Sequence, residues 1–175
     1  MPNPQVDSGT EPPASAPPVS AARKPPHGLF KYLVNPVMRM LLRSPLGARM
    51  GGVLLLLTFK GRKSGATFTT PVGYHRRDGE LVVFTESPWW RNLRGGAPVR
   101  LLLERRRVRA WADATDDPAV VLEYTQYFLP RVGVRNARRL ALTIPGDREP
   151  SADELRAALH GHAVVRLKVE ASAPT

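Results

Sequence analysis

The chain has 175 residues, no cysteine and a formal net charge of +11. This length fits one domain with a terminal extension better than two domains, and 42% hydrophobic residues can bury one sizeable core. The lack of cysteine excludes disulfides, thiolate metal sites and cysteine nucleophiles, and it fits a reducing cytoplasm. No run of about 18 uncharged apolar residues is present, so the sequence predicts no membrane-spanning helix.

The N-terminal part divides into a tail and a helix. Residues 1–26 are rich in proline, serine and alanine, which predicts a disordered tail followed by a single domain at 27–175. Apolar residues then recur near helical spacing within residues 29–43, where Pro36 either kinks one helix or starts a second one capped by Asn35. This amphipathic helix either packs on the domain, the favoured interpretation, or rests on anionic lipid in a peripheral membrane contact.

The rest of the chain alternates between strand and helix signals. Pro71 and Gly73 mark a break or bulge inside the second predicted strand, and the Arg-Asp-Gly sequence at 77–79 predicts a hairpin turn. Strands are predicted at 53–59, 66–76, 80–86, 98–104, 107–115 and 163–169, and helices at 89–94, 118–129 and 151–161. About six strands joined mostly by hairpins, with flanking helices, predict an α+β fold built on a mainly antiparallel barrel.

Several kinds of chemistry are excluded by the residues available. His160 and His162 lack a carboxylate or third ligand beside them, so the sequence predicts no metal site. No serine lies in a nucleophile elbow, and no carboxylate pair has a spacing typical of acid–base catalysis. Lys63-Ser64 resembles part of a phosphate-binding loop, but Arg62 stands where that loop requires glycine. An enzyme built from these residues must therefore rely on a bound cofactor.

One short segment, GRKSG at residues 61–65, permits two interpretations. Glycines on both sides allow a tight turn with inward amide groups, and Arg62, Lys63 and Ser64 add donors suited to phosphate or carboxylate. The same pattern is also that of an ordinary charged hairpin tip. Residue chemistry alone leaves the two interpretations about equal.

The runs LLTFKGRKSGATFTTPVGY, DGELVVFTES, WWRNL and RVRAWADATDDP occur in an order that resembles the deazaflavin-dependent nitroreductase and quinone reductase family of actinobacteria, over roughly residues 50–130. The resemblance implies a split β-barrel like that of flavin reductases. It also implies the deazaflavin coenzyme F-420, which is favoured over FMN, and hydride transfer to a quinone, nitroaromatic or similar acceptor. The cofactor-binding residues it implies are Gly61, Arg62, Lys63, Ser64, Gly65, Thr70, Pro71, Val72, Thr85, Trp89 and Asn92. The helix that follows would line the acceptor pocket with Tyr124 and Tyr127.

Two departures from the family pattern keep alternatives open. Phe68 occupies a position that is basic in family members, and only residues 86–88 separate the third strand from the tryptophan helix. The first alternative is therefore a non-enzymatic barrel that binds another anionic or apolar ligand. The second is a nucleic-acid-binding module, because residues 60–109 contain twelve Lys and Arg against four Asp and Glu, a net of +8. Catalytic residues are not identified, and a homodimer is compatible with the sequence.

Overall fold

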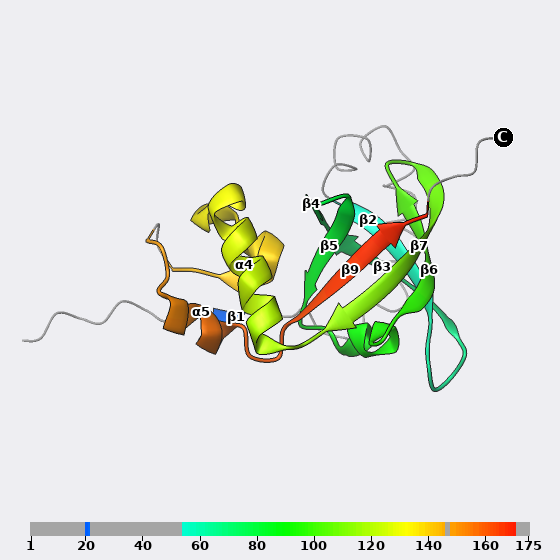
Figure 1. The fold of residues 1–175 in the computed structure, drawn as a ribbon, viewed down its shortest axis with the longest axis horizontal. Helices are drawn as coiled ribbons and strands as arrows, with labels where there is room; N and C mark the ends of the chain where they lie inside the picture. The colour runs from blue at the N-terminus through cyan, green and yellow to red at the C-terminus, as the bar shows by residue number, and fades with distance from the viewer. Residues whose placement is uncertain (1–19, 22–53, 146–147, 171–175) are drawn as a thin grey trace, which may run out of the picture.

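The computed structural model describes residues 20–21, 54–145 and 148–170 (Figure 1). Its main element is an antiparallel sheet curled into a half-barrel, with strand order β3-β2-β6-β7-β9-β5-β4. These strands are β2 (Leu54–Lys60), β3 (Thr67–Gly73), β4 (His75–Arg77), β5 (Glu80–Thr85), β6 (Ala97–Leu103), β7 (Arg106–Thr115) and β9 (Ala163–Val169). The predicted split β-barrel is thus confirmed. The helix expected at 29–43 and most of the tail expected at 1–26 lie outside the described residues.

The strand predicted at 66–76 is two strands separated by Tyr74. β3 pairs with β2, whereas β4 pairs with β5, and these two short strands form the opposite edges of the sheet. The chain therefore leaves one edge after Gly73 and joins the other at His75, and β3 also approaches β5 where the sheet curls. The break marked by Pro71 and Gly73 is confirmed, and it adds a seventh strand to the sheet.

Two hairpin turns close with residues in the left-handed region. The turn between β4 and β5 places Asp78 at φ 52° and Gly79 at φ 80°, as a two-residue hairpin loop requires. The β6–β7 turn uses Glu104 and Arg105 at φ 47° and 68°. It falls one residue earlier than the sequence predicted, because Arg106 already pairs with Leu103.

Alternate strand residues fill the inside of the barrel. Leu55, Leu57 and Phe59 of β2 are buried there, and the residues between them face the other side of the sheet. The same cluster holds Trp90 and Leu93 together with buried residues of β5, β6, β7 and β9. Burial of these side chains is the main term that stabilises the barrel.

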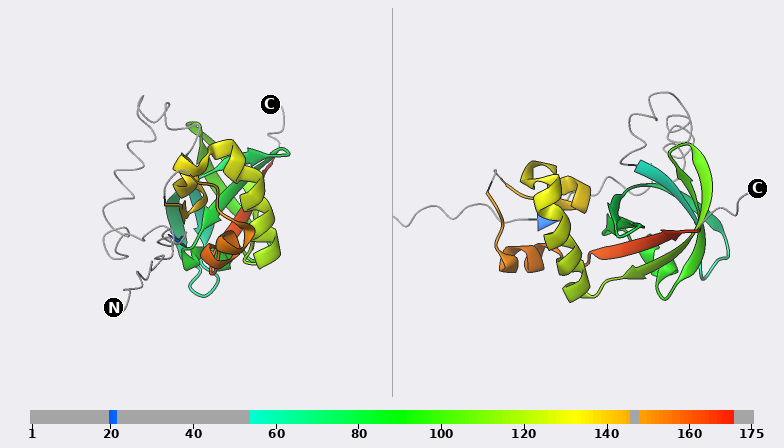
Figure 2. Two further views of the ribbon diagram at one scale, coloured as in Figure 1. Left: turned by 90° about the vertical axis from the view of Figure 1, so that its left-hand side faces the viewer. Right: turned by 45° about the horizontal axis from the view of Figure 1, so that its top comes forward.

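The helices cover the other side of β5 and β9. α4 (Pro118–Val132) packs there with α5 (Ala152–Ala158) and the 3₁₀ helix η3 (Val134–Leu140). Figures 1 and 2 show these elements gathered at one end of the barrel. Asp117 caps α4 as predicted, since its carboxylate accepts the N–H groups of Ala119 and Val120. None of the helices in the described ranges is long and apolar enough to cross a membrane.

Two small elements were not predicted. η3 lies between α4 and the two-residue strand β8 (Leu142–Thr143). β8 pairs with β1 (Ser20–Ala21), which falls in the segment expected to be a tail. A two-residue strand is too short to show a periodic pattern in the sequence. The two strands also lie more than a hundred residues apart, so no hairpin signal connects them.

We expect the α5 capping box to make stability depend on acid pH. Ser151 Oγ accepts the Glu154 N–H, and the Glu154 carboxylate accepts from Ser151 N (2.8 Å) and Arg148 Nη1 (2.8 Å). The hydrogen bond from Arg148, followed by that from Ser151, lowers the pKa of Glu154 from 4.5 to about 2. The carboxylate therefore stabilises the fold above pH 4.5, and this stabilisation is lost as the pH falls towards 2.

The measurement is urea unfolding of the wild type and Glu154→Gln between pH 7 and pH 3. The variant should be less stable at pH 7, and the difference should shrink steadily below pH 4.5. A difference that stays constant down to pH 3 would contradict this role.

Candidate functional site

The glycine-flanked turn connects β2 and β3. Gly65 adopts φ 65°, and its N–H donates to Gly61 O at 2.8 Å, while Gly61 N donates to Ala66 O at 2.8 Å. Ser64 Oγ accepts the N–H of Ala66 at 3.2 Å. The glycine amides thus close the turn instead of facing a ligand. The N–H groups of Lys63 and Ser64 have no acceptor among the described residues.

Arg62 ties this turn to the 3₁₀ helix η2 (Pro88–Leu93). Its backbone N–H donates to Asn92 Oδ1 at 3.0 Å, and its Nε donates to Asn92 O at 3.1 Å. Its Nη2 also donates to Arg94 O. The two main-chain acceptors, Asn92 O and Arg94 O, are carbonyl groups at the end of a helical turn, where intrahelical donors run out. The structure therefore brings together two predicted site residues, Arg62 and Asn92, in direct contact.

Three aromatic rings lie in series beside the turn. Phe68 stacks on Phe59 with ring centroids 5.8 Å apart, and Phe59 is 5.7 Å from Trp89. Phe68 remains 38% exposed and covers Gly61, where an added Cβ would come within 2.7 Å of the Phe68 ring. Trp89 is half-buried against the barrel core. The ring of Phe68 thus covers the turn.

The predicted strand residues lie on the edge of the sheet. β3 pairs only with β2 among the described strands, so one side of its backbone is unpaired. Pro71, which has no N–H, is suited to such an edge. Val72 is buried with the barrel core, and Thr70 is half-buried on the same face, opposite Leu57. Thr85 is buried at the end of β5, where its hydroxyl accepts the N–H of Ser87 at 3.1 Å.

A groove of about 630 Å³ runs from the turn onto the outer face of the sheet. Three of the eleven predicted cofactor residues line it: Gly61, Arg62 and Asn92. The other eight do not: Lys63, Ser64, Gly65, Thr70, Pro71, Val72, Thr85 and Trp89. Arg100 and Arg109 also line it, and they were not among the predicted residues. The signal for Arg109 was present, because polar and apolar residues alternate around it in the strand predicted at 107–115, whereas Arg100 precedes a run of three leucines that shows no alternation.

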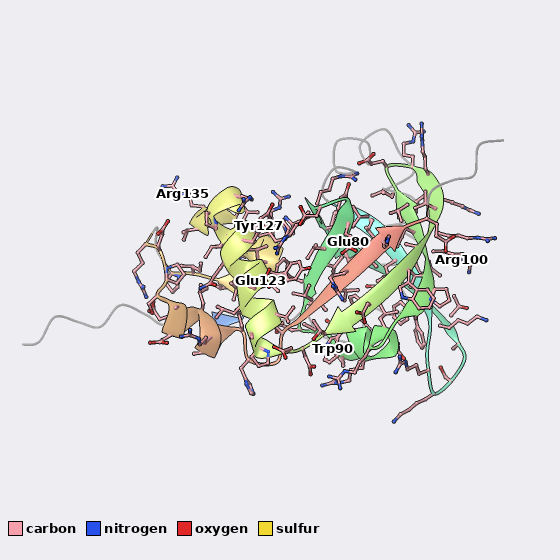
Figure 3. All side chains as sticks on the ribbon, viewed as in Figure 1. Glu80, Trp90, Arg100, Glu123, Tyr127 and Arg135 are labelled. Carbon is pink, nitrogen blue, oxygen red and sulfur yellow. The ribbon has the colours of Figure 1, made fainter. Side chains whose placement is uncertain are left out.

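Tyr124 and Tyr127 lie elsewhere. They belong to α4, and the Arg77 guanidinium stacks over both rings, at 4.7 and 4.3 Å from their centroids. Arg131 stacks on Tyr127 at 3.6 Å. Figure 3 places Tyr127 on the helical side of the sheet, and Figure 1 shows the β2–β3 turn at the opposite end of the barrel. The structure does not bring the two tyrosines next to the turn.

The buried histidine His75 has a structural role. His75 Nε2 lies 3.1 Å from Arg139 O, and its ring packs against Phe84 and Phe128. Burial lowers the pKa of His75 below 6.5, which favours a neutral ring. The described part of the chain contains no group of three His, Asp or Glu side chains placed to hold a metal ion.

Comparison with known proteins identifies the family. Solved structures with a similar arrangement include an F420 reductase, at 10% identity and a TM-score of 0.41, covering 69% of this chain and 88% of that one. Another is the FAD and heme binding protein from Mycobacterium smegmatis, at 19% identity and a TM-score of 0.38, covering 74% and 72%. No curated protein matches the sequence. The model of one family matches residues 34–129, which is more than half of the chain, and the protein therefore belongs to the F420H(2)-dependent quinone reductase family.

Proposed function

We propose that the protein is an oxidoreductase that transfers a hydride from reduced F-420 to a quinone, nitroaromatic or similar acceptor. Family membership supports the reaction class. The observation that carries the proposal for this chain is the groove at which the Gly61–Gly65 turn meets η2 through Arg62 and Asn92. The groove is lined by the basic residues Lys60 and Arg62 and by the ring of Phe59, and the unpaired amide groups of Lys63 and Ser64 belong to the same turn. A ligand with an acidic end and a flat ring requires this combination.

The residues present fit such a coenzyme in a defined way. Lys63 and Ser64 are exposed, and their N–H groups are open to a phosphate or carboxylate. The unpaired edge of β3 at residues 70–72 supplies backbone groups for the ring, and Phe59, Phe68 and Trp89 exclude water nearby. When bound, the coenzyme supplies the hydride; the protein's part is positioning.

The acceptor contact is proposed at Tyr124 and Tyr127. Their rings are half-buried and already stacked with Arg77, so an acceptor would meet the exposed rim of this stack. Because hydride transfer requires the acceptor to lie against the coenzyme ring, this part of the proposal requires the ring to extend from the turn towards the helical side of the sheet, where both tyrosines lie.

The test is titration of the purified protein with oxidised and reduced F-420, followed by absorbance and fluorescence. We expect Lys63→Ala to bind about tenfold more weakly, since it loses one charge-assisted contact to the acidic end. Lys168→Ala removes the same charge from an exposed position on β9 and should bind like the wild type. A wild-type protein that binds neither form of the coenzyme would overturn the proposed function.

A second candidate is a non-enzymatic barrel that binds another anionic or apolar ligand. The observation that favours it is the exposed ring of Phe68, stacked on Phe59 where a basic side chain would serve a phosphate. Mass spectrometry of the purified native protein tests this alternative. Recovery of an unrelated ligand that Phe68→Ala fails to retain would support it over the reductase.

A further inference from the structure

A row of polar side chains crosses the outer face of the barrel wall. Thr58 of β2 lies directly opposite Thr69 of β3 on one side and Arg100 of β6 on the other. Arg100 in turn lies directly opposite Arg109 of β7. The neighbours of these residues along each strand face the core, so the whole row is on the outside. Figure 3 shows Arg100 on the side of the barrel away from α4.

The arginines of this row lack the carboxylate partners that several other arginines of the described residues have. Arg76, Arg94 and Arg166 each form an ion pair with a carboxylate. No side-chain hydrogen bond or ion pair joins Arg100 or Arg109 to any described residue. The two grooves along this face are lined by one carboxylate, Glu170, against five basic side chains: Lys60, Arg62, Arg100, Arg107 and Arg109.

The facing arginines lower the free energy of unfolding. Like charges directly opposite each other on neighbouring strands repel, and Arg100 faces Arg109 in this way. Thr58 and Thr69 add hydroxyl groups 3.0 Å apart at the end of the row. A bound anion would offset the repulsion, because each guanidinium presents a planar fork of donors to phosphate oxygens.

The shape of the surface favours a small ligand. Grooves of about 420 and 630 Å³ meet here, and both are lined by Thr58, Thr67, Arg100 and Arg109. Volumes of this order are typical of small-molecule sites. A hollow of this size, with two guanidinium groups at its centre, fits a compact group with several negative charges better than a flat membrane surface.

We propose that this outer groove binds a small polyanion of the phosphate class, with Arg100 and Arg109 as the principal contacts and the threonine hydroxyls as further donors. The site occupies the β6 and β7 part of the groove of about 630 Å³, whose other end at Gly61 and Arg62 belongs to the proposed coenzyme site. Anion binding at Arg100 and Arg109 does not require the proposed reductase activity. Its ligand is either the anionic part of a coenzyme or a separate phosphate compound, and the two share the same recognition chemistry.

The test is calorimetric titration of the full chain with inorganic pyrophosphate at about 0.15 M salt, where charges outside the site are screened. We expect Arg100→Gln/Arg109→Gln to bind at least tenfold more weakly than the wild type. The matched control, Arg105→Gln/Arg106→Gln, removes the same charge from the β6–β7 turn and the first residue of β7, which are exposed and outside both grooves. It should bind within about twofold of the wild type, because screened charges outside the site contribute little.

Stability provides an independent readout. The groove variant should unfold at the same temperature as the wild type or a higher one, since it removes the repulsion between positions 100 and 109. Arg100→Lys/Arg109→Lys keeps the charge without the planar fork, and its affinity should fall between the other two. Equal affinities in the groove and control variants would overturn the proposal. Binding to duplex DNA or anionic vesicles without binding to pyrophosphate would overturn it as well.

Competition identifies the source of the anion. If F-420 displaces pyrophosphate, the groove receives the acidic part of the coenzyme; if both bind together, it serves a separate phosphate compound. Pyrophosphate binding by a protein that does not bind F-420 would overturn the reductase proposal and leave the groove standing. The experiments can therefore overturn the reductase proposal and the anion-binding proposal independently of each other.

Discussion

Replacing Trp90 by alanine is expected to destabilise the protein by about 3–5 kcal/mol, the usual cost of emptying a core position of this size. Trp90 is 2% exposed, lies on η2 and packs in the barrel core. The guanidinium groups of Arg91 and Arg94 cover its ring at 5.1 and 5.0 Å. Its loss would open a cavity below the helix that carries Asn92, the partner of Arg62. Urea unfolding followed by circular dichroism measures the change.

Trp111→Ala is the matched control for this substitution. Trp111 is 51% exposed and lies over Gly96, which approaches the ring so closely that an added Cβ would sit 2.7 Å from it. The same change there removes little buried surface and should cost about 1 kcal/mol or less. Similar losses at the two positions would show that η2 does not anchor the core as the structure indicates.

Most elements of the fold could be predicted because each leaves a local pattern. The strand at 163–169 was predicted with the bounds that β9 has, since its apolar residues and bounding turn are contiguous in sequence. The strand predicted at 66–76, with a break or bulge marked by Pro71 and Gly73, is two separate strands, because β-forming residues continue on both sides of Tyr74. The strand order of the folded sheet shows that β3 and β4 have different partners. A local sequence pattern cannot predict this, because it contains no information on which distant segments pair.

The candidate site was likewise only partly predictable from the sequence. The turn at 61–65 and its charges were visible in the sequence, but the use of its amide groups was not. Arg62 and Asn92 are thirty residues apart, and their contact depends on how η2 returns beneath the hairpin. The Arg100–Arg109 pair likewise depends on the register of β6 against β7. In each case the residue types were available, and the missing information was which ones meet.

The second large effect is expected at Arg62. Arg62→Ala removes two guanidinium hydrogen bonds to the carbonyls of Asn92 and Arg94, so the turn loses its attachment to η2. Because both bonds are exposed to solvent, each contributes about 0.5–1 kcal/mol, and the loss amounts to about 1–2 kcal/mol. We expect F-420 affinity to fall about a hundredfold, because Lys63 and Ser64 are then no longer held in place. Titration of the variant under the conditions used for Lys63→Ala measures this.

Arg62→Lys distinguishes two roles of Arg62, which are attachment of the turn to η2 and positive charge for the coenzyme. A lysine keeps the positive charge, but its ammonium cannot reproduce a planar fork that reaches two carbonyl groups. If Arg62 acts by fixing the turn, Arg62→Lys should resemble Arg62→Ala in both affinity and stability, whereas Lys63→Ala should lower affinity and leave unfolding unchanged. If Arg62 instead contacts the coenzyme as a cation, the lysine variant should retain most of the wild-type affinity. The geometry around Asn92 favours the first result, since the guanidinium already points at backbone acceptors.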